Sequence, residues 1–424
     1  MLTFIKMKMK KFTILFLLVS LQHINAQDAS RVITTGVPFL LVAADARAAG
    51  MGDQGVATAP DAFSQQWNPA KYAFAIDKQG FTTSYTPYLT ALVNDIALGQ
   101  VTYYNRINER SAFGVSLRYF SLGEIEFRDN SEDPANVVKP NELALDGSYA
   151  LKLSERFSMA VAGRYIRSQL RIPTVGVGGD AKPSSTFAVD IAGYYVGEEA
   201  AFNDFNGRLR LGFNFQNMGP KISYDAGGSD QNANFLPAQM RIGAGYDFIL
   251  DDFNKVTVSV ELAKLLVPTP QSADRNGNGV IDTTPYANPN DPTPNDPTND
   301  DSFIDELGIR DDNNTAYNKI NWVSGMFQSF GDAPGGFSEE LKEFTYSVGA
   351  EYLYQDSFAF RLGYFHESPL KGARQFFTLG AGFKYNVVKV DVSYLFSTSQ
   401  VKNPLENTLR FSLSFNFGDK YEDY

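Results

Sequence analysis

The sequence predicts an all-β fold, an antiparallel transmembrane β-barrel of about fourteen strands. A signal peptide stands at the N-terminus, short segments of alternating apolar and polar residues follow, and no long apolar run interrupts them. In the last of these segments, residues 408–417, the odd positions are large and apolar and the even positions are polar. Successive side chains of a strand lie on opposite faces, so this strand has one apolar face and one polar face. Such strands cross a bilayer only as a closed barrel, because lipid cannot satisfy a free strand edge.

Residues 1–26 are predicted to be a secretory signal peptide. Four lysines lie between residues 6 and 11, an apolar run covers residues 12–21, and Ala26 is the expected last residue before cleavage. The apolar run is too short for a membrane helix, which needs about 20 residues. No later run approaches that length, so the export signal and the strands together predict a multi-pass protein of the outer membrane, in contact with its lipid.

Composition excludes several classes of function. The chain of 424 residues has no cysteine, so it forms neither disulfides nor thiolate metal sites. Of its two histidines, His23 lies in the signal peptide and His366 is expected to lie wholly exposed at a loop tip. Ser368 is close to His366 in sequence, but nothing marks it as a nucleophile. The net charge of −11 argues against a nucleic-acid partner. We therefore expect a protein that is not an enzyme.

The barrel is expected to span residues 80–417. The alternation predicts fourteen strands, an even number as in single-chain bacterial barrels, although twelve or sixteen also fit because two segments are weakly patterned. Soluble sheets rarely place Phe and Tyr on every face that should be wet, which argues against a sandwich or solenoid. The strands are expected at 80–88, 95–107, 110–121, 142–153, 156–170, 186–197, 206–217, 236–250, 254–265, 342–355, 357–367, 371–386, 387–399 and 406–417.

The connections alternate between short and long. Those after even-numbered strands are mostly short, with residues 197–206 as a moderate exception, whereas the long ones follow odd-numbered strands. Outer-membrane barrels have short periplasmic turns and long external loops. Both termini are therefore expected in the periplasm, with 418–424 as a periplasmic tail and the longest loop, 266–341, outside the cell.

The polar faces carry charges of both signs, which leaves two interpretations. Compensating pairs could fill the interior, since buried charges must be paired, or the charges could line a path for a solute. The first interpretation is favoured. The charged residues expected in the lumen are Arg118, Arg164, Arg210, Arg361, Lys384, Arg410, Asp146, Asp190, Glu261, Glu351 and Asp391. Five apolar residues are also expected there and could form a small apolar pocket or pack against the N-terminal segment: Phe120, Leu353, Phe365, Phe376 and Leu395.

Residues 27–79 do not alternate and are expected to form a separate segment before the first strand. Glycines at 50, 52 and 55 permit tight turns and close backbone approach, and Asn68-Pro69 indicates a turn or a helix start. The glycine spacing suggests nucleotide binding, but no strand precedes it and the protein is exported. We reject that interpretation.

This segment resembles the N-terminal hatch of FadL-type (OMPP1-like) barrels, which plugs a fourteen-stranded lumen. The motifs are Arg-Ala-x-Gly-Met-Gly from Arg47, Val-Ala-Thr-Ala from Val56, and Asn-Pro-Ala from Asn68. Within that superfamily the match extends over residues 37–40, 45–52, 64–72 and 103–120, and there the sequence more closely resembles the PorV family of the type IX secretion system. The expected hatch residues are Arg47, Gly50, Met51, Gly52, Gly55, Trp67, Asn68 and Pro69.

The resemblance to the PorV family implies a non-enzymatic adaptor or shuttle. Such proteins partner the giant SprA-like secretion pore and accept exported cargo that carries a C-terminal signal domain. FadL-type proteins instead transport long-chain hydrophobic molecules, and that function remains the alternative. Neither function implies a cofactor.

Part of the long loop resembles a calcium-binding loop. Oxygen ligands at positions one, three, five, seven and nine fit the pattern, with a glycine at six. The twelfth position should be acidic but is Pro285, so affinity should suffer. An Asx-rich turn explains the same residues. The candidate calcium ligands in 274–282 are Asp274, Asn276, Asn278, Val280 and Asp282.

The same loop ends in a helical stripe. Trp322, Met326 and Phe330 recur every four residues, and Phe327 is beside them. An apolar stripe outside the cell needs something to cover it. It could fold down over the barrel mouth, or it could dock against the secretion pore or its cargo. Trp322, Met326, Phe327 and Phe330 are therefore candidate partner-binding residues.

Overall fold

The computed structural model describes residues 32–90, 92–128, 136–170, 183–224, 233–276, 280–290, 303–399 and 403–421. The predicted signal peptide lies outside the described residues. The chain divides into two compact units. The larger one, residues 31–272 and 310–424, contains the barrel, and the smaller one contains residues 273–309.

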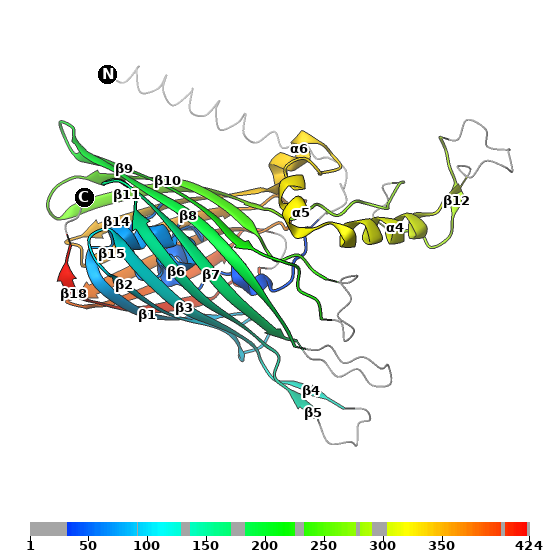
Figure 1. Ribbon diagram of the computed structural model, residues 1–424, viewed down its shortest axis with the longest axis horizontal. Helices are drawn as coiled ribbons and strands as arrows, with labels where there is room; N and C mark the ends of the chain where they lie inside the picture. The colour runs from blue at the N-terminus through cyan, green and yellow to red at the C-terminus, as the bar shows by residue number, and fades with distance from the viewer. Residues whose placement is uncertain are drawn as a thin grey trace, which may run out of the picture. The chain divides into compact units, whose positions relative to one another are not determined.

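The larger unit is a closed antiparallel barrel, in which β1 pairs with both β2 and β18 (Figure 1). All fourteen predicted strands are present, and the fold class is confirmed. The strands are β1 (Asp77–Pro87), β2 (Ile96–Arg106), β3 (Ser111–Leu122), β6 (Asn141–Lys152), β7 (Phe157–Gln169), β8 (Ser184–Ala201), β9 (Asn206–Met218), β10 (Gln239–Ile249), β11 (Asn254–Leu265), β14 (Phe344–Tyr354), β15 (Phe358–His366), β16 (Gln375–Tyr385), β17 (Val388–Ser397) and β18 (Leu409–Lys420).

Burial alternates along the strands. In β7, for example, Val161 is 56% exposed while its neighbours Ala160 and Ala162 are buried. The exposed positions of the strands form an apolar outer surface that suits contact with lipid. Among the described residues, no helix is long and apolar enough to cross a membrane. Outward-facing apolar side chains include Val101, Leu145, Val161, Leu211, Val260, Leu362 and Phe411.

The two ends of the barrel differ in the length of their connections. We call them the short-turn end and the long-loop end. The moderate connection expected at 197–206 is shorter than its sequence suggested, because β8 continues to Ala201 and leaves only residues 202–205. A register shift between Val196 and Glu199 accompanies this extension. The connection between β8 and β9 is therefore short, like the others at the short-turn end.

The first and last strands extend further than expected. β1 begins at Asp77 rather than at residue 80, and Lys420 of β18 pairs with Asp77. Gly418, at φ 94°, lies in this extension, where a register shift occurs. The tail predicted at 418–424 is thus shorter, and residues 422–424 lie outside the described residues. Pairing between the first and last strands of a closed barrel is a tertiary contact, which local alternation does not reveal.

The long loops carry secondary structure of their own. The loop 266–341 contains α4 (Glu306–Lys319), α5 (Trp322–Gln328) and α6 (Phe337–Glu340), followed by the 3₁₀ turn η5 (Leu341–Glu343). A two-stranded sheet joins β12 (Tyr286–Ala287) to β13 (Phe303–Ile304), and another joins β4 (Ile125–Phe127) to β5 (Asn136–Val138). The helix α4 was not expected, because its residues are polar without a clear apolar stripe.

Candidate functional site

Residues 32–76 lie inside the barrel and contact its wall on several sides. This hatch contains η1 (Pro38–Leu41), α2 (Ala46–Ala49), α3 (Ser64–Trp67) and η2 (Pro69–Phe74). Its hydrogen bonds reach strands all around the lumen. They join Ala46 N to Ser412 Oγ of β18 (2.8 Å), Gly52 N to Thr378 Oγ1 of β16 (3.0 Å), Gln65 Oε1 to Ser148 Oγ of β6 (2.6 Å) and Asn68 Nδ2 to Gly193 O of β8 (2.9 Å).

Glycines of the barrel wall make room for the hatch backbone. A Cβ atom on Gly363 would lie 2.0 Å from Gly52 N, and one on Gly212 would lie 2.1 Å from Val56 O. Gly52 itself has φ 80°, a conformation that favours glycine. Gly50 packs in the same way against Gly380, where an added Cβ would lie 3.0 Å from a Cα atom. The hatch therefore rests directly on the strands, backbone against backbone.

Arg47 connects the hatch to the wall through buried ion pairs. Its Nη2 and Nε atoms donate to both carboxylate oxygens of Glu351 at 2.8 and 3.1 Å, and Nη1 donates to Asp61 at 2.7 Å. Arg361 donates to Glu351 at 2.6 Å and to Asp391 at 2.8 Å. Each charge in this network has a partner of opposite sign, as buried charges require.

The other predicted hatch residues hold the hatch's own shape. Trp67 Nε1 donates to Asp45 Oδ2 at 2.6 Å, and Asp45 Oδ1 also caps α2 by accepting from Ala48 N at 2.7 Å. Asn68 caps η2, which Pro69 opens, by accepting from Ala70 N at 3.0 Å. Two further contacts complete the set: Gly55 N donates to Glu261 of β11 at 2.8 Å, and Met51 is buried against Gly349.

A second charge network fills the lumen away from Arg47. Asp146 pairs with both Arg118 and Arg164, and Arg164 also pairs with Asp190 at 2.8 Å. The interpretation of compensating pairs is therefore confirmed for these residues. Lys384, which was expected in the same interior, is only half-buried.

The apolar lumen residues pack against the hatch and its neighbours. Phe120 stacks on Phe39 of η1 with ring centroids 6.1 Å apart, and Phe365 stacks on Phe376 at 4.8 Å. Phe365, Phe376 and Leu395 form one cluster that Val42 of the hatch covers in part. Leu353 is only half-buried and takes no part in it. Of the two interpretations of these residues, packing against the hatch describes the structure.

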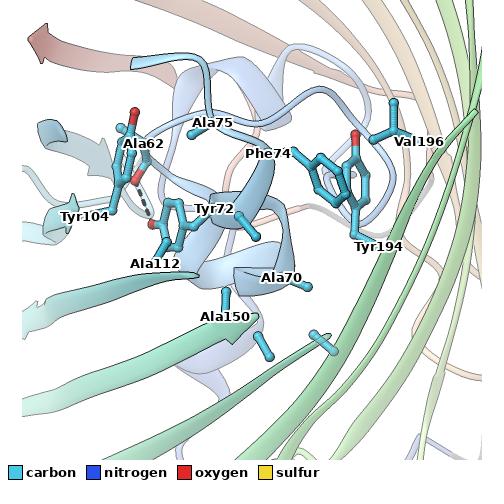
Figure 2. Packing of buried hydrophobic residues seen from close by; sticks show 13 residues of the cluster. Ala62, Ala70, Tyr72, Phe74, Ala75, Tyr104, Ala112, Ala150, Tyr194 and Val196 are labelled. Carbon is cyan, nitrogen blue, oxygen red and sulfur yellow. Dashed lines mark hydrogen bonds between the residues drawn. The ribbon is translucent and has the colours of Figure 1, made fainter. Parts of the chain in front are cut away.

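A third apolar cluster closes the lumen at the short-turn end (Figure 2). Tyr72 of η2 stacks on Tyr104 of β2 at 4.8 Å, and Phe74 packs against Tyr194 of β8 at 5.9 Å. Small alanines of the strands surround these rings. Charge networks and apolar clusters together leave the described part of the lumen plugged.

At the long-loop end, an exposed apolar surface lies on α5, α6 and the residues beside them. Phe327 is 73% exposed and Phe337 is 78% exposed. The predicted helical stripe divides: Trp322 and Met326 are half-buried, while Phe330 follows the end of α5 and is exposed. We name the outer apolar surface by its exposed members, which are Val323, Phe327, Phe330, Phe337 and Leu341.

Buried ion pairs attach this surface to the barrel. Lys371, between β15 and β16, donates to Glu339 at 2.7 Å and to Glu343 at 2.8 Å. Lys264 of β11 pairs with Glu343 and, at 3.3 Å, with Glu340. Burial by itself raises the pKa of Glu343, but hydrogen bonds from Lys264 and Lys371 outweigh it and hold that pKa below its ordinary value. The outer apolar surface therefore has a fixed base.

In the smaller unit, Glu306 organises the loop that resembles a calcium site. Its carboxylate accepts from the backbone N–H groups of Arg275 (2.7 Å) and Asp282 (2.9 Å) and from the Tyr286 hydroxyl (2.8 Å). These hydrogen bonds, that from Asp282 foremost, lower the pKa of Glu306 to about 2. The carboxylate is therefore charged, and its bonds are intact, throughout the neutral and mildly acidic range.

Four of the five candidate calcium ligands, all but Asn278, fall within the described residues. Asn276 Nδ2 donates to Asp282 Oδ2 at 2.8 Å, so these two ligands lie close together. Within the described ranges, no three His, Cys, Asp or Glu residues are grouped to hold a metal ion. Glu306 contacts this loop and could replace the acid missing at Pro285, but its carboxylate already accepts from backbone donors. Calcium binding stays a prediction, with weak affinity.

The family of the chain follows from comparison with known proteins. A family model described as "Type IX secretion system protein PorV" matches residues 25–272, which is more than half of the chain. The chain belongs to the PorV family. A search of curated proteins gave no match.

Solved structures similar to this PorV-family chain include two toluene transporters and a FadL homologue. The toluene transporter TodX of Pseudomonas putida has a TM-score of 0.47 and 11% identity over 87% of this chain and 97% of that one. A FadL homologue of Pseudomonas aeruginosa has a TM-score of 0.42 and 12% identity over 92% and 100%. The toluene transporter TbuX of Ralstonia pickettii has a TM-score of 0.44 and 12% identity, over 90% of this chain and 100% of that one.

The hatch of this PorV-family chain was predictable from its sequence, but the barrel residues that bind it were not. Glu261 and Glu351 were expected in the lumen, yet their partners Gly55 and Arg47 lie about two to three hundred residues away. Arg47 itself was the available signal. It is a charged residue in a segment expected inside a barrel, and a buried charge needs an acidic partner nearby. Nothing in the sequence pattern marked Asp45 as the acceptor for Trp67.

His366 is not the wholly exposed loop-tip residue that was expected. It is the last residue of β15, its ring stacks on Tyr346 at 4.6 Å, and its Nδ1 lies 3.3 Å from the Tyr364 hydroxyl. All three are outward-facing positions near the long-loop end of this PorV-family chain, and outer-membrane barrels have girdles of aromatic residues at both membrane interfaces.

Replacing Glu306 with Gln should loosen the loop of the smaller unit. The amide accepts hydrogen bonds from backbone N–H groups less strongly than the carboxylate does. The backbone at Arg275, whose side chain is already exposed, should therefore become more mobile and easier for a protease to bind. We expect trypsin to cleave after Arg275 several-fold faster than in the wild type. Asp311→Asn, which removes only the exposed contact with Arg310, is the matched control. Equal cleavage of Glu306→Gln and the control would show that Glu306 does not hold the loop.

Calorimetry with calcium tests the weak site. We expect titration to millimolar concentrations to release heat, with affinity on the order of 10⁻⁴–10⁻³ M because the acid of position twelve is missing. The double variant Asp274→Asn with Asp282→Asn should abolish that heat. A wild-type protein that releases no heat with millimolar calcium would remove the hypothesis.

Proposed function

We propose that the protein is a non-enzymatic outer-membrane adaptor of the type IX secretion system. It docks the outer apolar surface onto the giant secretion pore and accepts exported cargo with a C-terminal signal domain. In this arrangement both termini are periplasmic and the long-loop end faces the outside. One observation carries the proposal: a plugged barrel presents exposed aromatic side chains, Phe327 and Phe337, on a base fixed by buried ion pairs.

The outer apolar surface has the features of a docking site. Large apolar groups clustered outside the membrane need a cover, and aromatic anchors contribute most of the energy of many interfaces. Lys264 and Lys371 hold α6 and η5. The helix α5 packs through Gly325 against Phe235 and Pro268, so little ordering is required when a partner binds. Membership of the PorV family supports a partner from the secretion system.

The alternative, transport of a long-chain hydrophobic molecule, needs an apolar pocket in the lumen. The apolar lumen residues instead pack on one another and on the hatch. A cavity between Leu41 of the hatch and Phe365 of β15 has a volume of about 60 Å³ and also contains charged side chains. Pockets that enclose a drug-sized ligand have about 300–1,000 Å³, so this cavity cannot enclose a long acyl chain.

Affinity purification of the tagged protein from native outer membranes tests the proposal. The adaptor should bring down a very large membrane protein in stoichiometric amount, together with signal-bearing cargo. A lone barrel with a stoichiometric bound lipid would instead support the transporter. Extraction in mild nonionic detergent is required, because an apolar interface of this kind dissociates in harsher ones.

A further inference from the structure

A second cavity opens at the short-turn end, between the hatch and strands β8 to β11. It has a volume of about 80 Å³. One wall is apolar and is formed by Phe74 and Ile76 of the hatch and by Tyr194 and Val196 of β8. Figure 2 shows Phe74 and Tyr194 side by side with Val196 next to them. The Tyr194 hydroxyl donates to Thr58 O at 3.1 Å, so its ring and not its polar end is available to an occupant.

The opposite wall is positively charged. Arg208, Arg210 and Lys255 line it, and Asp247 is the one carboxylate among the lining residues. Arg210 pairs with Asp247, and Arg208 pairs with Glu199 at 2.9 Å. Lys255 is half-buried, and its side chain makes no hydrogen bond or ion pair with any described residue. Lys255 is therefore a cation of this cavity without an ion pair among the described residues.

Arg210, on the same wall, also has a hydrogen-bond donor without a partner among the described residues. The residue is 4% exposed, and its Nη2 atom has no hydrogen-bond partner among the described residues. A buried donor left without an acceptor is unfavourable, because it has lost its hydrogen bonds to water. An anionic ligand at this wall would meet the free charge of Lys255 and the spare donor of Arg210 together.

We propose that this cavity binds a carboxylate attached to a short apolar group. The carboxylate pairs with Lys255 and Arg210, and the apolar group lies against Phe74, Tyr194 and Val196. The volume admits one side chain or a small ring and excludes a long acyl chain, so the ligand differs from that of the alternative transporter. A small organic acid and the C-terminus of a polypeptide share this chemistry. The site does not depend on the docking function proposed above.

Calorimetry on the purified full-length barrel in a nonionic detergent tests the site with two pairs of probes. The first pair is 4-phenylbutyrate and its neutral amide, and the second is the tripeptide Gly-Gly-Phe with a free or an amidated C-terminus. In at least one pair the free acid should bind and the amide should bind at least about tenfold more weakly, a difference of about 1.4 kcal/mol. The pair that responds identifies the source of the carboxylate. Partition into micelles favours the neutral amide, so it cannot mimic this preference.

Two variants locate the binding. Lys255→Gln should weaken it at least about tenfold, and Val196→Trp should block it by filling the apolar wall. Lys78→Gln is the matched control, because Lys78 also lies at the short-turn end but pairs with Asp419 at 3.2 Å outside the cavity. Heat-modifiable migration reports that each variant is folded. Equal binding of acid and amide, unchanged affinity in both variants, or no heat with millimolar probe would overturn the proposal.

Discussion

Replacing Glu351 with alanine is expected to lower the free energy of unfolding by about 3–5 kcal/mol. The substitution leaves Arg47 of the hatch without its bidentate partner and removes one of the two acids that face Arg361. Breaking a buried pair by removing one partner is costly, because the other charge stays buried without compensation. The measurement is the urea concentration at which the purified barrel loses its heat-modifiable migration.

The control and the rescue separate this effect from simple loss of a surface charge. Asp419→Asn breaks the exposed pair with Lys78 and should change stability by less than about 1 kcal/mol. The double variant Arg47→Met with Glu351→Met should recover part of the loss, since Arg361 keeps Asp391 at 2.8 Å while the partly exposed Asp61 loses Arg47. Equal losses in Glu351→Ala and Asp419→Asn, or a double variant worse than the single one, would contradict the role assigned to Arg47.

The double variant Phe327→Asp with Phe337→Asp is expected to abolish copurification of the secretion pore. Truncation of an aromatic anchor typically costs about 2 kcal/mol or more, and charges at both positions add a desolvation cost. The barrel should stay folded, because both side chains are exposed and neither takes part in the ion pairs of Lys264 and Lys371. The readout is the ratio of pore to barrel after affinity purification.

Phe303→Asp is the matched control for that experiment. Phe303 is an exposed aromatic residue of the same long loop, but it lies in the smaller unit, outside the outer apolar surface. It should leave the pore bound. Trp322 is a poorer choice for substitution, since it is half-buried and its loss would mix misfolding with lost docking. Equal copurification of the pore with the wild type, the double variant and the Phe303→Asp control would rule out docking through this surface.

The strands were predictable because their signal is local. Alternation decides which face of a segment meets lipid, and it located all fourteen strands. These include β2 and β8, which correspond to the two weakly patterned segments predicted at 95–107 and 186–197. Contacts between distant residues carry no such signal. Arg47 and Glu351 are separated by 304 positions, and nothing between them indicates that they meet. The same holds for Lys420 opposite Asp77, which lengthened both strands beyond their predicted ends.

The long loop shows where local patterns give no signal. Its helix α4 begins at Glu306, with the Asp305 carboxylate accepting from Gly308 N at 3.0 Å as in an N-cap. The helix is polar on most of its surface, so no periodic stripe revealed it. The stripe in α5 was found, but which of its members are exposed depends on Phe235 and Pro268, which approach Gly325 from positions distant in the sequence.

Site-specific photo-crosslinking in living cells tests the docking account most directly. A photoreactive amino acid at position 337 lies on the outer apolar surface, and one at position 187, which is 66% exposed on β8, should face lipid. We expect a single crosslinked product of very high mass from position 337, containing the secretion pore, and no such product from position 187. Equal products from both positions, or none from position 337 in cells that secrete normally, would contradict it.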